Sequence, residues 1–345
     1  MSNDPVTDPV TGPATGLATD NDYADAHLQL QALRTLLERV IVGQASLITH
    51  LITAVFAGGH VLIEGLPGLG KTHLAKALAA ALGLQWARVQ CTPDLMPADI
   101  TGGEIYATAA GGASTFEFRP GPVFAQLVLV DEINRATPRT QAALLEAMQE
   151  RQVTHALISH RLPSPFCVLA TQNPIELEGT YPLPEAQLDR FMFKLTVPFP
   201  DRAALREMLD VSLDAEPADT LHSVAGPADV LRITQLCRTV LLAERCKDAA
   251  VELILATQPD AGGADSPLRR HIRYGASPRA LQAVVRAARV RALMAGRAHV
   301  DVDDLEALAL PVLRHRILLR LESELDGLDT DTTLTSIIKA WRARL

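Results

Sequence analysis

The feature that most constrains the fold is a glycine-rich run, Gly65-Leu66-Pro67-Gly68-Leu69-Gly70-Lys71-Thr72. It fits the pattern GxxxxGK[ST] at every fixed position, between an apolar segment, Val61–Glu64, and a segment with helical spacing, Lys71–Leu82. Glycines allow successive N–H groups to converge on an anion, and a helix N-terminus adds positive potential. We expect Lys71 to reach the β- and γ-phosphates and the Thr72 hydroxyl to take a Mg²⁺ position. The run therefore predicts the phosphate-binding loop of an α/β nucleotide-binding fold.

Further apolar segments alternate with helical ones after this loop. A helix is expected over Pro138–Arg151, because Thr137 can cap it and proline stands in its first turn. Strands alternating with helices predict a parallel sheet with right-handed crossovers. The expected strands after Val61–Glu64 are Trp86–Gln90, Leu127–Val130, Phe166–Thr171 and Met192–Val197.

Beyond Pro198-Phe199-Pro200 the chain shows helical patterns and no strand signal, so we expect an all-α second domain. Its helices are predicted at Arg202–Leu209, Val230–Leu242, near Val251, and at Pro278–Ala295, Val302–Leu319 and Thr333–Leu345. At the other end, residues 1–26 carry five aspartates and no lysine or arginine, which is typical of a disordered acidic tail. The predicted organisation is thus a tail (1–26), an α/β core (27–200) and a helical domain (201–345).

Two carboxylates follow the wholly apolar segment Leu127–Val130, namely Asp131 and Glu132. Ligands of open α/β sheets bind at the carboxyl ends of the strands, so both side chains are expected beside the phosphate loop. Asp131 can hold Mg²⁺ or its water, and Glu132 can polarise an attacking water. This pair indicates hydrolysis rather than transfer to another acceptor.

Another apolar strand ends in a polar amide at Asn173, which we expect near the γ-phosphate and able to orient a water. Two arginines, Arg190 and Arg279, are also candidates, although a surface ion pair is the default reading of each. The sequence contains no NKxD motif of a guanine-specific GTPase and no LSGGQ-like signature of a transporter ATPase.

The formal net charge is −8, so no strong basic field exists to hold nucleic acid or an anionic membrane constitutively. Four cysteines without a CxxC pair predict reduced, buried thiols rather than a disulfide scaffold or a metal site. No signal peptide is visible, and no apolar stretch approaches the ~20 residues of a membrane span. We therefore expect a cytoplasmic protein.

Several longer motifs resemble the MoxR family of AAA+ ATPases, over roughly residues 30–317. Those motifs are Thr92–Gly102, Asp131–Ala136, Gln141–Glu150, Ala170–Glu176, Gly179–Phe191, Gly275–Ala280 and Val312–Arg316. The resemblance implies a AAA+ core followed by an all-α lid. It also implies an insert near Pro97–Phe118 and a β-hairpin over Gln152–Pro163.

The resemblance implies a role for each candidate. Asp131 and Glu132 would form Walker B, Asn173 sensor 1, Arg190 the arginine finger and Arg279 sensor 2. The adenine pocket and Walker A would be formed by Val42, Gly43, Gln44, Pro67, Gly68, Leu69, Gly70, Lys71, Thr72 and His73.

The function that this resemblance implies is Mg²⁺-dependent ATP hydrolysis by a homo-oligomeric, hexameric ring. The ring would remodel or activate a client, often with a separate von Willebrand factor A domain protein as partner. Alternatives are a magnesium-chelatase-like ATPase subunit, a nucleic-acid motor resembling the MCM helicases, and a nucleotide-binding scaffold without turnover. The net charge argues against the motor, and the intact Glu132 argues against the scaffold.

Overall fold

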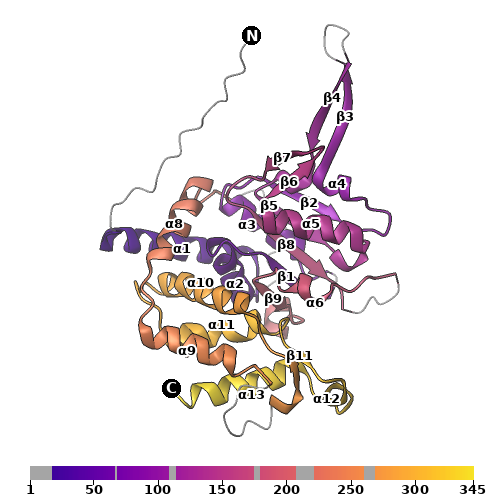
Figure 1. Ribbon diagram of the computed structural model, residues 1–345. Coiled ribbons are helices and arrows are strands. Elements are labelled where there is room, and N and C mark those ends of the chain that lie inside the picture. Colours follow the sequence, from indigo (N-terminus) through magenta and orange to yellow (C-terminus); the bar gives the residue numbers. More distant parts are fainter. Residues whose placement is uncertain (1–17, 67, 109–113, 175–178, 207–220, 260–268) are drawn as a thin grey trace.

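The computed structural model describes residues 18–66, 68–108, 114–174, 179–206, 221–259 and 269–345 (Figure 1). Its centre is a five-stranded sheet in which every printed pairing is parallel, with the order β2-β5-β8-β1-β9. The strands are β1 (Val61–Glu64), β2 (Trp86–Gln90), β5 (Leu127–Asp131), β8 (Cys167–Gln172) and β9 (Phe193–Thr196). The five predicted strands and the parallel sheet are confirmed, with strand ends that differ by at most one residue.

Helices cover both faces of the sheet, so alternate residues of each strand enter two different cores. Val61 and Ile63 pack with α1 (Asp20–Val40), α2 (Ala45–Phe56) and α3 (Lys71–Ala81). Leu62 faces the opposite core, which includes residues of α4 (Pro97–Thr101) and α5 (Pro138–Glu150). Strands buried on both faces need continuous apolar runs, which explains why their sequence signal was clear.

The first helix begins earlier than the sequence pattern indicated. Thr19 caps α1: the Asp22 N–H donates to the Thr19 hydroxyl at 3.3 Å, and the Asp22 carboxylate accepts from the Thr19 N–H at 2.8 Å. The prediction of a disordered tail up to residue 26 is therefore wrong for residues 20–26. A capping box at Thr19 and Asp22 stabilises this first stretch, and Tyr23 and Ala26 pack on the core. Residues 1–17 lie outside the described part of the chain.

The C-terminal region is helical, as expected, and its helices pack on the core. They are α8 (Pro227–Thr239), α9 (Glu244–Leu255), α10 (Pro278–Met294), α11 (Val302–Leu313), α12 (Leu321–Leu325) and α13 (Thr330–Arg342). Gln31 of α1 donates to the Met294 carbonyl at 2.7 Å, so the first helix ties the lid to the core. The predicted helix over 202–209 is seen at 202–206, and its remainder falls outside the described residues.

Two details of the helical region correct the sequence prediction. A small antiparallel ribbon pairs β10 (Ile272–Tyr274) with β11 (Leu318–Leu319), so the region is not purely helical. The helix expected over Val302–Leu319 ends at Leu313, because the Arg316 side chain turns back onto the Val312 carbonyl. Strands of two or three residues leave no periodic signal in a sequence.

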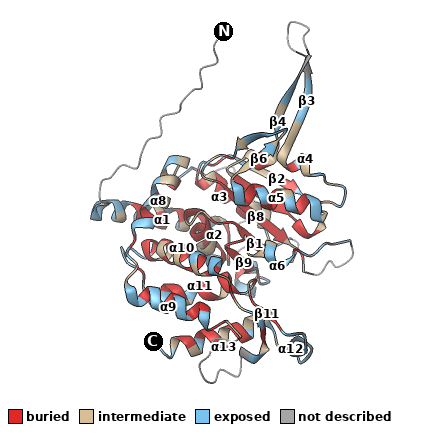
Figure 2. Cartoon of the chain, in the orientation of Figure 1, coloured by how far each residue is buried: buried red, intermediate tan, exposed pale blue. Residues whose placement is uncertain are grey.

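Two hairpins project from the core: the one that the resemblance implied over Gln152–Pro163, and a longer one where it implied an insert. One joins β3 (Gly102–Thr108) to β4 (Ser114–Pro120), and the other joins β6 (Gln152–His155) to β7 (Ile158–Arg161). The long hairpin extends away from the rest of the molecule, and much of its described surface is exposed (Figures 1 and 2). Phe118 stacks on His160 with ring centroids 3.9 Å apart, which couples the two hairpins.

Short elements complete the description: η1 (Pro122–Phe124), η2 (Ile133–Arg135), α6 (Glu185–Leu188) and η4 (Arg269–His271). All four cysteines are buried and free. Across the described ranges, no helix combines the length and the apolar character that a bilayer crossing requires.

Candidate functional site

The glycine-rich run lies between β1 and α3, in the context that its sequence predicted. Gly68 and Gly70 adopt φ values of +82° and +74°, a left-handed conformation that side chains with a Cβ rarely take. Gly70 is the N-cap of α3, so the helix starts where the loop ends. Pro67 lies outside the described residues. The free N–H groups of the helix start thus face the position expected for phosphate.

Lys71 is half-buried and turns back on its own loop. Its Nζ donates to the Gly65 carbonyl at 2.5 Å. Burial lowers the pKa of the ammonium, while the charges of Asp131 and Glu132 act in the opposite direction. A phosphate group would offer the ammonium a charged acceptor in place of a neutral carbonyl.

Thr72 and Asp131 lie side by side at the carboxyl edge of the sheet. The Thr72 Oγ1 is 3.5 Å from Asp131 Oδ2, and Thr171 Oγ1 donates to Asp131 Oδ1 at 3.3 Å. Arg88 of β2 also donates to Asp131 Oδ2, at 2.7 Å. A hydroxyl and a carboxylate oxygen suit Mg²⁺, which typically takes one or two protein ligands and keeps several waters. These residues therefore fit the predicted metal position.

Glu132 stands in a strained backbone conformation, with φ 56° and ψ 51°. Its N–H donates to Thr171 Oγ1 at 2.9 Å, which helps to hold that conformation. Its Oε2 accepts hydrogen bonds from Gln90 and Arg135, both at 3.1 Å. The Glu132 carboxylate is thus restrained by one neutral donor, Gln90, and one charged donor, Arg135.

Asn173 is buried directly after β8, the strand between β5 and β1. The sheet order therefore places it between the strand that leads into the phosphate loop and the strand that ends in the carboxylate pair. On the other side of the loop, Gln44 donates to the Leu69 carbonyl at 3.4 Å. Val42 is buried beside it, and Gly43 adopts φ +75°. The predicted adenine segment thus contacts the phosphate loop, and His73 follows in the first turn of α3.

Arg190 and Arg279 lie elsewhere, at the opposite edge of the sheet. Both line a cavity of about 360 Å³ whose lining includes Gly59 and Met192, which precede β1 and β9. The described residues that line this cavity include none from the phosphate loop. The structure therefore separates these two arginines from the site that their own chain forms.

An ion pair that sequence reasoning missed positions both arginines. The guanidinium of Arg316 donates to Asp189 Oδ1 at 2.6 Å and to the Phe191 carbonyl at 2.7 Å. Ser277, two residues before Arg279, donates to the same carboxylate at 3.1 Å. Asp189 thus joins the Arg190 segment to the start of α10. The sequence signals were the family motifs Gly179–Phe191 and Val312–Arg316, which contain Asp189 and Arg316 but did not indicate that they pair.

The guanidinium of Arg190 uses only part of its hydrogen-bonding capacity. Its Nη1 donates to the Leu145 carbonyl at 2.7 Å, whereas its buried Nε has no partner among the described residues. Arg88 and Gln90, which hold the two carboxylates, were also missed, since nothing in β2 distinguishes them from ordinary polar strand residues.

This arrangement, a phosphate loop opposed by a carboxylate pair on a parallel sheet, defines a P-loop nucleotide-binding protein. Residues 60–193 match the ATPase family associated with various cellular activities (AAA), and residues 268–337 match the AAA lid domain. The first match spans the sheet up to the start of β9, and the second spans the helical region from η4 into α13. The class of the protein is therefore that of the AAA ATPases.

Full-length relatives define the class more closely. The chain is 37% identical to Chaperone MoxR1 of Mycobacterium tuberculosis, over 88% of this chain and 79% of that protein. It is 39% identical to the uncharacterized protein YeaC of Bacillus subtilis, over 92% and 95% of the two chains. A protein of Cytophaga hutchinsonii assigned as an ATPase has a crystal structure with a TM-score of 0.85 at 37% identity, covering 93% and 96%. The chain belongs to the MoxR family of AAA+ ATPases.

Proposed function

We propose that this ATPase hydrolyses Mg²⁺-bound ATP at the carboxyl edge of its sheet, as a subunit of a hexameric ring. The observation that carries the proposal is the convergence of Lys71 and Thr72, from the start of α3, with Asp131 and Glu132, from the end of β5. These residue types at these places supply phosphate binding, a metal position and a base. The relatives support the ATPase class, and the geometry of these residues supports their roles.

The residues divide the chemistry among them. Lys71 and the helix N-terminus bind the phosphates, and Thr72 with Asp131 would hold Mg²⁺. The bound ion would neutralise phosphate charge as the terminal bond breaks. Glu132 takes the proton of the attacking water, and Asn173 orients that water. Gln90 and Arg135 hold the Glu132 carboxylate until ATP is in place.

The two separated arginines support the proposal of a ring. Arg190 and Arg279 share one cavity at the amino edge of the sheet, away from the phosphate loop of their own chain. In a head-to-tail ring this edge would face the carboxyl edge of the next subunit. Each arginine would then stabilise the phosphates bound by that neighbour, and a single subunit would be an incomplete enzyme.

The client is a protein, and the hairpins are where it would bind. Tyr106 and Phe116 of the long hairpin are 67% and 71% exposed, and Leu157 of the second hairpin is 99% exposed. The second hairpin follows α5 directly, and α5 begins just after Glu132 and η2. Movement at the site can thus reach the hairpins through one helix. We further propose a cytoplasmic location and a separate von Willebrand factor A domain protein as partner.

The experiment is the substitution Glu132→Gln. We expect ATP to stay bound while turnover falls about 10²-fold or more, the scale of losing a general base. Isothermal titration measures the binding, and phosphate release measures the turnover. Glu322→Gln, at an exposed position of α12, is the matched control. Wild-type turnover in Glu132→Gln would refute the assigned base. Joint loss of binding and turnover, in a folded variant, would refute the assigned division of roles.

A further inference from the structure

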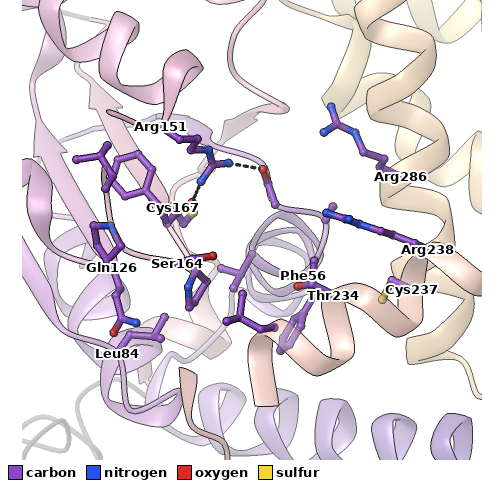
Figure 3. Close-up of a pocket in the computed structure, with 18 of the residues that line it drawn as sticks. Phe56, Leu84, Gln126, Arg151, Ser164, Cys167, Thr234, Cys237, Arg238 and Arg286 are labelled. Atoms are coloured by element: carbon purple, nitrogen blue, oxygen red, sulfur yellow. Dashed lines mark hydrogen bonds between the residues drawn. The ribbon is translucent and has the colours of Figure 1, made fainter. Parts of the chain in front are cut away.

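A second cavity, of about 380 Å³, lies between the core and the lid at the amino edge of the sheet (Figure 3). Its core wall includes Gly58, Leu84, Gln126 and Phe166, which stand just before β1, β2, β5 and β8 respectively. Its other wall comes from α8 and α10 of the helical region. The cavity is therefore on the opposite side of the sheet from the phosphate loop.

Four arginines line this cavity: Arg151, Arg238, Arg286 and Arg289. Its described lining contains no aspartate or glutamate, and none of the four arginines forms an ion pair with a described carboxylate. Figure 3 shows Arg151, Arg238 and Arg286 reaching into the space between the core and the lid. Concentrated positive charge without counter-charge is the property of an anion-binding site.

Two of the four arginines, Arg151 and Arg286, are anchored by hydrogen bonds to backbone carbonyls. Arg151 ends α5 and donates to the Phe166 and Gly58 carbonyls, at 2.5 and 2.8 Å. Arg286 donates to the Gln282 carbonyl at 3.3 Å. The buried Nε of Arg289 has no partner among the described residues. The cavity thus presents donors that the protein itself leaves partly unused, and unused buried donors favour an external acceptor.

The environment of this cavity acts on the charges of Arg151 and Arg286. Burial lowers the pKa of Arg151 and of Arg286, and neighbouring guanidinium groups lower each pKa further. A guanidinium nevertheless keeps its proton in proteins, so the mutual repulsion persists until an anion neutralises it. On α10, Arg286 and Arg289 are three residues apart and therefore share a face.

Gly58, Arg151 and Arg286 also line the cavity that holds Arg190 and Arg279, so the two cavities adjoin. We infer that the second cavity is a binding site for a small organic polyphosphate, separate from the phosphate loop of its own chain. Arginine is the side chain best suited to phosphate, because its planar fork meets two oxygens. The volume lies within the range of small-molecule pockets, about 300–1,000 Å³. Leu84, Leu162 and Phe166 supply apolar surface for the organic part.

The arginines of this cavity come from both the core and the lid. Arg151 belongs to the core, whereas Arg238 and Arg286 belong to two lid helices. A multivalent anion that bridges them would restrain the lid relative to the core. The ligand would therefore act as a regulator and not as a substrate.

The test uses inorganic tripolyphosphate as the probe and the full-length chain carrying Lys71→Ala, which disables the phosphate loop. Isothermal titration is performed at a protein concentration where sedimentation shows monomers. We expect saturable binding of one tripolyphosphate per chain. Adding Arg238→Gln and Arg286→Gln should weaken it by about tenfold or more, the scale of losing hydrogen bonds to a charged group. The matched control is Arg245→Gln, whose side chain is 75% exposed on α9.

A second measurement, hydrogen exchange, does not depend on whether the double arginine variant folds. Hydrogen exchange of Lys71→Ala with tripolyphosphate should slow on both walls, in α8 and in residues 163–167. Absence of binding, unchanged affinity in the double arginine variant, or protection limited to the phosphate loop would each overturn the inference. Binding of tripolyphosphate only to assembled subunits would also overturn it. The probe would then occupy the nucleotide site between two subunits and not a site within one chain.

Discussion

Arg88 donates through Nε to the Oδ2 of Asp131 at 2.7 Å, the carboxylate oxygen that also lies closest to the Thr72 hydroxyl. The guanidinium therefore occupies part of the position at which we expect Mg²⁺. Arg88 is half-exposed and Asp131 is buried. The arginine neutralises a carboxylate that would otherwise be buried and unpaired until the ion arrives.

This relationship predicts an altered Mg²⁺ requirement in Arg88→Gln. The variant removes a competing cation, so half-maximal ATPase activity should need about two- to fivefold less Mg²⁺, since a half-exposed ion pair contributes up to about 1 kcal/mol. A Mg²⁺ titration of phosphate release measures this, with Arg245→Gln as the exposed control. A higher Mg²⁺ requirement would mean that Arg88 organises the site instead of competing for it.

Lys71→Ala should lose most affinity for ATP. The ammonium already lies at the loop, bonded to the Gly65 carbonyl, and its charged hydrogen bond to phosphate is worth at least about tenfold in binding. Isothermal titration with ATP checks the loss. Lys247→Ala, at an exposed position of α9, should bind as the wild type does. Unchanged ATP affinity in Lys71→Ala would contradict the assigned phosphate loop.

Arg190→Ala should bind ATP normally as a monomer and yet fail to hydrolyse it. An arginine supplied by a neighbouring subunit has been worth about 10³–10⁵ in rate in GTPases. Mixing Arg190→Ala with Lys71→Ala should restore part of the activity, because an intact Arg190 on one chain can then face an intact phosphate loop on the other.

The same experiment with Arg245→Ala in place of Arg190→Ala is the control, and it should be active before mixing. Two outcomes speak against action between subunits. One is wild-type hydrolysis by Arg190→Ala, and the other is an inactive mixture in which mixed rings are shown to form.

A buried histidine predicts acid sensitivity. His60 Nδ1 accepts from the Val168 N–H at 3.0 Å, which leaves Nε2 to donate to the Met148 carbonyl at 3.3 Å. Burial, together with the charge of Arg151, lowers the pKa of His60 to about 3. In the unfolded chain its pKa returns to about 6.5. Between these values the unfolded chain binds a proton that the folded chain does not.

The free energy of unfolding should therefore fall as pH drops below about 6.5, by up to about 1.4 kcal/mol per pH unit from this group. His60→Gln keeps an acceptor and a donor but cannot titrate, so its loss of stability between pH 7 and pH 5 should be smaller. Urea unfolding at both pH values measures the difference. His222→Gln, at an exposed position, should follow the wild type. Equal slopes for all three proteins would show that His60 does not control this sensitivity.

The sheet, the phosphate loop and the carboxylate pair follow from local features of the sequence. Apolar runs such as Val61–Glu64 and Leu127–Asp131, and the glycines of the loop, specify their structure through neighbours a few residues away. Because the carboxyl ends of parallel strands share one edge, their order along the chain already implied that Lys71, Asp131 and Asn173 would meet. Two predictions from the sequence were wrong, the start of α1 and the absence of strands in the helical region. The first turns of α1 depend on a cap, and strands of two or three residues leave no periodic pattern.

Which polar side chains meet across long stretches of sequence depends on how the lid and the core pack together. Asp189 pairs with Arg316, 127 residues further on, and Arg88 reaches Asp131 across two adjacent strands. The arginine-lined cavity joins Arg151 of the core to Arg238 of the lid. A single arginine looks the same in the sequence whether it forms a surface ion pair or lines a binding site. Its role depends on partners that only packing of the lid against the core brings within hydrogen-bond distance.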